Sequence, residues 1–196
     1  MKKNHYHLSN KLELYGIVFN SRLNIEGRNN AIYIEQGSIL KNCDIKIFGN
    51  NNTICIKNNC YLLQCKFWIE DNNGEILIGA GTTVSGKSHF ACIEGTKIIL
   101  GNDCMLSSNI TFRTGDSHSI IDMQNKRINP SENIVIGDHV WIGNQVIINK
   151  GVKISNNSII GTGAIVTKQF ESVNIIIAGN PAKIIKSGIN WKRERL

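Results

Sequence analysis

Residues 134–167 read IVIGDHVWIGNQVIINKGVKISNNSIIGTGAIVT and repeat with a period of six. An aliphatic residue recurs at every sixth position, at Ile136, Ile142, Ile148, Ile154, Ile160 and Val166. A small or β-branched residue stands four positions after each of the first five, at Val140, Val146, Val152, Ser158 and Ala164. Such periodicity indicates a solenoid of stacked units. We interpret each unit as a short strand and a turn with its aliphatic side chain pointing inward, so that three units close one triangular coil.

The N-terminal half repeats with a longer period of 22 residues. Three columns of apolar residues share this spacing: Leu12, Ile34, Ile56, Ile78 and Leu100; Val18, Leu40, Leu62, Val84 and Leu106; and Ile25, Ile47 and Ile69. Turns recur with them at Asn29-Asn30, Asn51-Asn52 and Asn73-Gly74, where asparagine and glycine tolerate unusual backbone angles. The columns predict longer coils of the same parallel β-helix. Unrelated strands of a β-sandwich would not form columns.

The length of 196 residues fits one domain. We expect an all-β chain with an N-terminal cap over 1–11 and a single β-helix over 12–186, interrupted by a protruding loop over 113–133. A short C-terminal tail or helix over 187–196 should follow. The segment from Pro181 onward, which includes Trp191, should fold back over the end of the solenoid or against a neighbour.

Composition narrows the classes of protein. The chain has 34 Ile, 26 Asn and 18 Gly but 2 Pro, which favours strands and tight turns over helices, and 41% apolar residues exclude disorder. A formal charge of +7 favours anionic partners such as nucleic acid, phosphate-bearing cofactors or acidic polymers, without choosing among them.

Targeting signals and cysteine chemistry point to one compartment. Residues 1–10 lack the apolar run of a secretory signal, and no stretch approaches the roughly 18 apolar residues that span a membrane. The six cysteines form no CxxC pair and no zinc-like group with histidine. We therefore expect a cytoplasmic protein.

The interruption at 113–133 is the predicted place for chemistry, because loops that leave a rigid scaffold often carry function. His118 lies near its start and is a candidate general base. Asp116, two residues earlier, could orient the imidazole or could cap a turn. His89 precedes Thr111 by one 22-residue coil, which predicts a position beneath the loop with an acceptor-side or a structural role. His139 lies at an outward turn, where a surface role is expected.

Three motifs in the C-terminal half carry a family resemblance: DHVWIGN at 138–144, IGTGAIVTK at 160–168 and AGNPAKIIK at 178–186. They resemble the hexapeptide-repeat acyltransferases, and most of all the O-acetyltransferases of galactosides, maltose and bacterial surface polysaccharides. The first hundred residues match in architecture alone. The resemblance implies a left-handed β-helix, a homotrimer with active sites between adjacent prisms, and acetyl-CoA bound along the groove between them.

The resemblance also implies residue roles. His118 matches the family's catalytic histidine, and Trp141 matches a tryptophan that lines the site. Contacts with CoA are implied for Gly143, Asn144, Thr162, Thr167, Lys168, Lys183 and Lys186. Lysines suit the phosphates of CoA, although each could also be a solvated surface residue. His89, Arg113 and Arg127 are the candidate acceptor-binding residues.

The implied mechanism is direct acetyl transfer. His118 removes the proton of an acceptor hydroxyl as it attacks the thioester, and a backbone N–H near Gly143-Asn144 stabilises the oxyanion. No metal is required. The favoured acceptor is a bacterial surface saccharide, either an acidic capsule such as polysialic acid or a lipopolysaccharide O-antigen. Alternatives are a chloramphenicol or streptogramin acetyltransferase, a non-catalytic β-helix subunit, and a carbonic anhydrase with zinc on three histidines.

Overall fold

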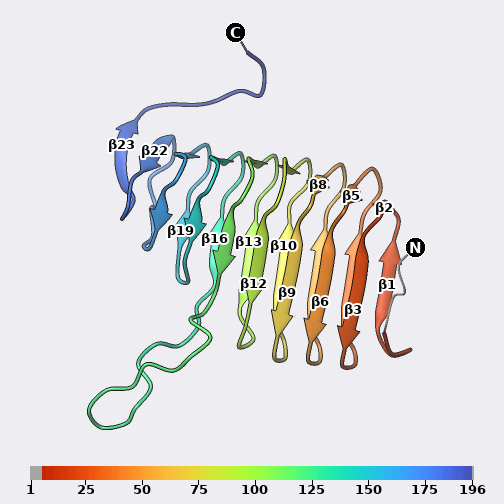
Figure 1. Cartoon of the computed structure of the whole chain (residues 1–196). Helices are drawn as coiled ribbons and strands as arrows, with labels where there is room; N and C mark the ends of the chain where they lie inside the picture. The colour runs from red at the N-terminus through yellow and green to blue at the C-terminus, as the bar shows by residue number, and fades with distance from the viewer. Residues whose placement is uncertain (1–5, 196) are drawn as a thin grey trace.

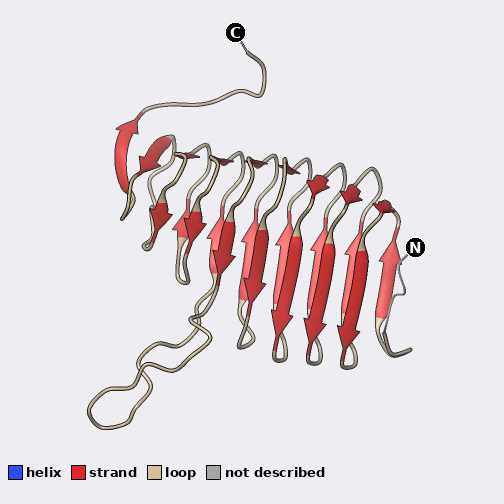
Figure 2. Ribbon diagram, in the orientation of Figure 1, coloured by secondary structure: helices blue, strands red, loops and turns tan. Residues whose placement is uncertain are grey.

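The chain winds into a parallel β-helix whose coils stack in sequence order from the N-terminal to the C-terminal end (Figure 1). The computed structural model describes residues 6–195, and every regular element in that range is a β-strand (Figure 2). The predicted fold class is therefore confirmed. No helix within those residues is long and apolar enough to cross a membrane.

Each coil contributes one strand to each of three sheets, which we name sheets I, II and III. Sheet I contains β1 (Lys11–Leu14), β4 (Ala31–Ile34), β7 (Thr53–Ile56), β10 (Glu75–Ile78), β13 (Lys97–Leu100), β16 (Ile134–Ile136) and β19 (Lys153–Ile154). Sheet II contains β2 (Ile17–Phe19), β5 (Ile39–Lys41), β8 (Tyr61–Leu63), β11 (Thr83–Val84), β14 (Met105–Leu106), β17 (Trp141–Ile142), β20 (Ile159–Ile160), β22 (Ile175–Ala178) and β23 (Lys183–Ser187). Sheet III contains β3 (Arg22–Glu26), β6 (Asp44–Phe48), β9 (Lys66–Glu70), β12 (His89–Cys92), β15 (Thr111–Arg113), β18 (Ile147–Ile148) and β21 (Ile165–Val166).

The predicted columns form the interior. In sheet II, Val18 pairs with Leu40, and the column continues through the later coils. Ile25, Ile47 and Ile69 form the matching column in sheet III. All six aliphatic residues of the six-residue repeat are buried. On the inner face of sheet III an aromatic stack adds to this core, and the ring centroids of Phe67 and Phe90 are 5.1 Å apart. One continuous apolar ladder therefore stabilises each face.

The first coil departs from the predicted spacing. Leu12 pairs with Ile32, and Leu14 rather than Leu12 stands opposite Ile34. The turn after β1 holds two residues, whereas the turn after β4 holds four. Gly16 permits this shortcut, because a Cβ there would lie 2.5 Å from the carbonyl oxygen of Ser38. The assignment of Leu12 to the column of Ile34 was therefore wrong by two residues, and Leu14 takes that place.

The asparagine turns behave as predicted. Asn29, Asn51 and Asn73 have φ values of 56°, 58° and 63°, in the left-handed region that asparagine tolerates better than most residues. They stack one coil apart, so each coil turns at the same corner.

Two segments leave the solenoid. Residues 114–133 project away from it between β15 of sheet III and β16 of sheet I (Figure 1). After β22 the chain reverses into β23, which pairs antiparallel with β22, and the tail then runs back along the coils. The predicted N-terminal cap lies partly outside the described residues, which begin at residue 6.

Candidate active site

Both ends of the protruding loop are fastened to the solenoid at Thr114. Its buried hydroxyl oxygen accepts hydrogen bonds from the backbone N–H of Ile93, at 3.0 Å, and from the hydroxyl of Thr96, at 2.7 Å. Its carbonyl oxygen accepts the N–H of Glu132 from the returning end of the loop, at 2.9 Å. The loop therefore starts and ends at a rigid point of the β-helix.

His118 is exposed near the start of this loop, and its ring makes no hydrogen bond within residues 6–195. Its backbone is held by Asn129, whose Nδ2 donates to the His118 carbonyl oxygen at 2.8 Å. The Asn129 Oδ1 accepts the N–H of Ile120 at 2.7 Å. The imidazole is thus free to meet a substrate while its main chain is fixed.

Asp116 faces Lys150 and Asn129. The Lys150 ammonium lies 2.5 Å from Asp116 Oδ2, and Asn129 Nδ2 donates to the same oxygen at 2.8 Å. The hydrogen bond from Lys150, followed by that from Asn129, lowers the pKa of Asp116 below its ordinary value. Within one chain the carboxylate anchors the loop to the turn after β18, and its predicted orienting role toward the His118 ring remains a prediction.

Asn129 and Lys150 were not identified from the sequence. Asn129 is 6% exposed within a polar loop, and the Asn129-Pro130 turn was the one local signal for it. Lys150 belongs to the repeat, and nothing in the pattern connects it with a residue 34 positions earlier.

The two predicted acceptor-side arginines take different positions. Arg127 pairs with Glu94 at 2.7 Å, which ties the loop to the turn after β12. Arg113 ends β15 and donates to the hydroxyl of Ser117 at 2.8 Å. Arg113 therefore stays beside the start of the loop, whereas Arg127 helps to close its base.

His89 lies on the outer face of sheet III, directly opposite Thr111 as the 22-residue spacing predicts. Its Nε2 is buried and has no hydrogen-bond partner among the described residues. Burial, assisted by the charges of Lys66 and Arg113, lowers the pKa of His89 to about 4. The imidazole is therefore neutral at physiological pH.

Trp141 and His118 belong to different faces of one chain. Trp141 is in β17 of sheet II, paired with Met105 and Ile159, and its side chain is 37% exposed. His118 follows β15 of sheet III. A single chain does not bring the two predicted site residues together.

The predicted CoA-side residues occupy three places. Gly143, Asn144 and Thr162 share the corner between sheets II and III, one coil apart. The N–H of Gly143 donates to the Ile160 carbonyl oxygen at 2.8 Å and is engaged in the ladder. The backbone N–H of Asn144 has no partner among the described residues, so it is the remaining oxyanion-hole candidate at this corner.

The remaining candidates are basic or polar and exposed. Thr167 and Lys168 follow β21 at the corner between sheets III and I, the corner from which the loop leaves in an earlier coil. Lys183 and Lys186 project from β23 at the C-terminal end of sheet II. The first pair therefore lies beside sheet III, and the second pair lies at the C-terminal end of the solenoid.

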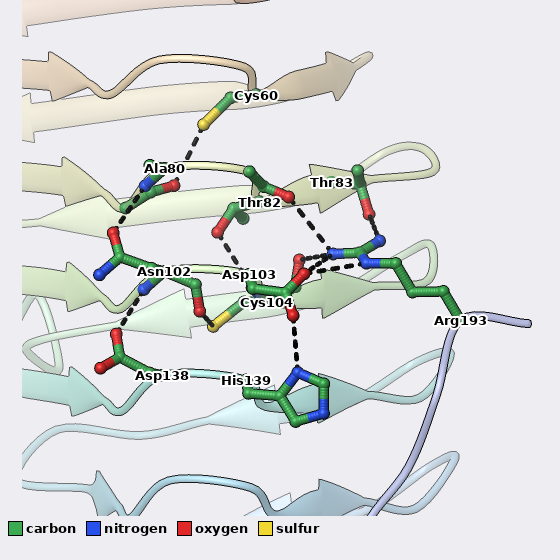
Figure 3. A network of polar contacts seen from close by, with 12 residues as sticks. Cys60, Ala80, Thr82, Thr83, Asn102, Asp103, Cys104, Asp138, His139 and Arg193 are labelled. Atoms are coloured by element: carbon green, nitrogen blue, oxygen red, sulfur yellow. Dashed lines mark hydrogen bonds and ion pairs between the residues drawn. The ribbon is translucent and has the colours of Figure 1, made fainter.

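His139 is held in a polar network rather than on an open surface (Figure 3). Its Nδ1 lies 2.7 Å from Asp103 Oδ2, and its Nε2 lies 3.0 Å from the carbonyl oxygen of Trp191. Arg193 of the tail also binds Asp103, at 2.9 Å. The expected role as a plain surface residue therefore misses these contacts. Their partners are 36 and 52 residues away in sequence, so no local pattern indicates them.

The zinc alternative requires three converging histidines. His139 is committed at the corner between sheets I and II, whereas His89 lies on sheet III. Among residues 6–195, no group of three potential metal ligands comes together.

Comparison with known proteins agrees with this architecture. Residues 133–168 match the family described as bacterial transferase hexapeptide (six repeats). A polysialic acid O-acetyltransferase from Escherichia coli O1:K1 / APEC is 37% identical over 120 residues, which are 61% of this chain and 38% of the relative's length. The chain thus spans well under two thirds of that relative.

Two solved structures extend the comparison. The polysialic acid O-acetyltransferase OatWY superimposes with a TM-score of 0.93 at 33% identity, over 96% of this chain and 90% of its own. A hexapeptide-repeat acetyltransferase from Vibrio cholerae O1 biovar eltor, complexed with acetyl coenzyme A, matches with a TM-score of 0.51 at 26% identity, over 62% of this chain and 64% of its own. From its repeat, its coil geometry and this near full-length match, the chain belongs to the hexapeptide-repeat acetyltransferases.

Proposed function

We propose that the protein transfers the acetyl group of acetyl-CoA to a hydroxyl of a bacterial capsule saccharide, with polysialic acid as the leading acceptor. The observation that carries the proposal is the exposed ring of His118, which has no partner between residues 6 and 195, on a loop pinned to the solenoid by Thr114 and Asn129. The near full-length likeness to OatWY supports the acceptor, and the acetyl-CoA complex of the Vibrio relative supports the donor.

The chemistry follows from the imidazole. His118 accepts the proton of the acceptor hydroxyl as its oxygen attacks the thioester carbonyl, which contributes about 10² to 10⁴ in rate. The Asn144 N–H donates to the oxyanion that develops. The departing thiolate then takes the proton from the imidazolium. Because the acceptor oxygen attacks the thioester directly, no covalent bond to the enzyme forms.

A complete site requires a second copy of the chain in this proposal. His118 and Trp141 lie on different faces of one chain, and a neighbour's Trp141 and Asn144 would complete the site beside His118. The loop supports such a contact because its apolar side chains are largely exposed in one chain, at Ile120, Ile121, Met123 and Ile128.

The outer faces of sheets I and II support packing between copies. Sheet I carries an outward apolar column of Tyr33, Cys55, Leu77, Ile99 and Val135. Sheet II carries Ile39, Tyr61, Thr83, Met105, Trp141 and Ile159 in its outward column, with Thr83 as its one polar member. A contact of sheet I with sheet II of the next copy is heterologous, and such contacts close into a ring when the rotation between copies returns to the first copy. The three faces of the β-helix and the family resemblance favour a ring of three. We therefore infer a homotrimer.

The direct test is acetyl transfer by purified protein, measured as thiol release from acetyl-CoA with polysialic acid, neutral oligosaccharides and chloramphenicol as acceptors. We expect turnover with polysialic acid and a loss of at least about a hundredfold in His118→Ala, with acetyl-CoA affinity unchanged. His7→Gln is the matched control, because that exposed ring lies before the first coil. Turnover with chloramphenicol alone would move the acceptor assignment to drug inactivation, and an active His118→Ala variant would remove the proposed base.

A further inference from the structure

A pocket on the outer face of sheet III lies beside the start of the catalytic loop. It is lined by Lys66, Trp68, Glu70, His89, Arg113 and Ser117, together with Ala91 and Ile93. Ser117 directly precedes His118, and Arg113 donates to its hydroxyl at 2.8 Å. The pocket therefore opens next to the proposed catalytic group.

Two cations in this pocket lack an acidic partner. The described residues supply neither Lys66 nor Arg113 with a carboxylate, whereas Lys46, Lys57, Lys97 and Lys150 each have one. The Lys66 ammonium is instead held over the Trp68 ring, 4.4 Å from its centroid. A pair of positioned cations without counter-charges is suited to an anion.

The one carboxylate of the pocket is already engaged. Glu70 Oε1 accepts the Trp68 Nε1–H at 2.7 Å, so the indole holds it to one side. His89 adds no charge, because burial and the two cations keep its imidazole neutral above about pH 4. The pocket thus has a net charge of +1.

One lining residue of the pocket has a polar atom without a hydrogen-bond partner among the described residues. The buried Nε2 of His89 has no partner among the residues that the structure describes. Buried polar atoms in native proteins are nearly always paired, so an unpaired nitrogen on a residue that lines a cationic pocket indicates that a ligand or water completes it.

We propose that this pocket binds the carboxylate of an acidic sugar in the acceptor, with Lys66 and Arg113 as its cationic partners. The inference rests on the proposed saccharide acetylation and adds the feature by which acidic acceptors are selected over neutral ones. Arg113 can donate two parallel hydrogen bonds to a carboxylate, and Lys66 supplies a second positive charge. The acceptor chain then extends from sheet III toward the loop that carries His118.

The test measures equilibrium binding by calorimetry, so it does not depend on turnover. The ligands are oligosialic acid and the same oligosaccharide with its carboxylates reduced to alcohols. We expect the native protein to bind the acidic form at least about tenfold more tightly, which is the effect of one charge-assisted hydrogen bond. The variant Lys66→Met/Arg113→Gln should bind both forms equally weakly.

A matched control separates the pocket from general charge. Arg28→Gln/Lys41→Met removes the same two charges from exposed residues near the N-terminal end of the solenoid, and it should retain the preference. Equal binding of both ligands by the native protein, or an unchanged preference in the pocket variant, would overturn the proposal. Weakened acetyl-CoA binding in the pocket variant, with unchanged oligosialic acid binding, would assign the cations to CoA phosphates instead. Selective binding without acetyl transfer would leave the pocket standing while the proposed reaction failed.

Discussion

Asn129 donates a hydrogen bond from Nδ2 to the main-chain carbonyl oxygen of His118 at 2.8 Å. The same amide nitrogen donates to Asp116, and the amide oxygen accepts from Ile120. One buried side chain therefore holds the main chain at and after the proposed base, together with the carboxylate of Asp116 before it. We infer that Asn129 is a positioning residue for His118.

The variant Asn129→Ala should lower kcat roughly 10- to 100-fold, because a misplacement of about 1 Å can cost that much in rate. The KM for acetyl-CoA should change less than about threefold, and the pH profile of kcat/KM should keep its shape because the same imidazole is still the base. Steady-state kinetics over a range of pH measures all three. Gln124→Ala, at the exposed tip of the loop, is the control and should keep native kcat. A native kcat in Asn129→Ala would show that the loop does not need this bridge.

His89 gives the folded protein a pH-dependent stability. Its pKa is lowered to about 4 in the native state, against about 6.5 for an unperturbed histidine. Between these values the unfolded chain binds the proton and the native chain does not, so the contribution of His89 is full above pH 6.5 and is lost as the pH falls toward 4. The free energy of unfolding, measured with denaturant at pH 7, 6 and 5, should therefore fall less steeply in His89→Gln than in the native protein. His7→Gln, at an exposed position, should keep the native slope; equal slopes for His89→Gln and the native protein would contradict the assignment.

The architecture follows from the sequence because both periods are geometric. Residues that recur at the same place in each coil stack on their equivalents in the neighbouring coils, and Val18, Leu40 and Leu62 are neighbours for that reason. The first coil differs because a two-residue turn at Gly16 replaced a four-residue turn, and the column at Leu12 alone does not reveal the change in length.

The site was less predictable because its contacts join segments without a repeat. The spacing located His89 opposite Thr111 correctly, since both belong to columns. The bond between Asn129 and His118 and the ion pair between Lys150 and Asp116 depend on the path of a single irregular loop. No period connects such residues, so they become visible only in three dimensions.

The proposed subunit contact makes a prediction about sheet I. Leu77 faces outward in the middle of its apolar column, so Leu77→Lys should leave the β-helix folded while it places a charge in the interface. Light scattering should then give a mass near 21.8 kDa instead of three times that value. Asn24→Lys adds the same charge on the outer face of sheet III and should remain trimeric. A trimeric Leu77→Lys variant would exclude this face from the contact.

The structure indicates that Trp191 anchors the C-terminal tail. Its side chain is 6% exposed, its ring stacks on His139 with centroids 4.0 Å apart, and its Nε1 donates to the His139 carbonyl oxygen at 2.9 Å. Trp191→Ala should therefore lower the free energy of unfolding by roughly 2 kcal/mol, the value of burying one large apolar side chain. Hydrogen exchange should accelerate at the Ile189 amide, which bonds to Asn174. Loss of the ion pair with Asp103 in Arg193→Ala should cost less than about 1 kcal/mol, because that pair is partly exposed to solvent. The ring of Trp191 also lies 6.2 Å from that of Trp141, so release of the tail should change the environment of Trp141 as well. Native exchange and native stability in Trp191→Ala would mean that β23, and not this stacking, holds the tail to the solenoid.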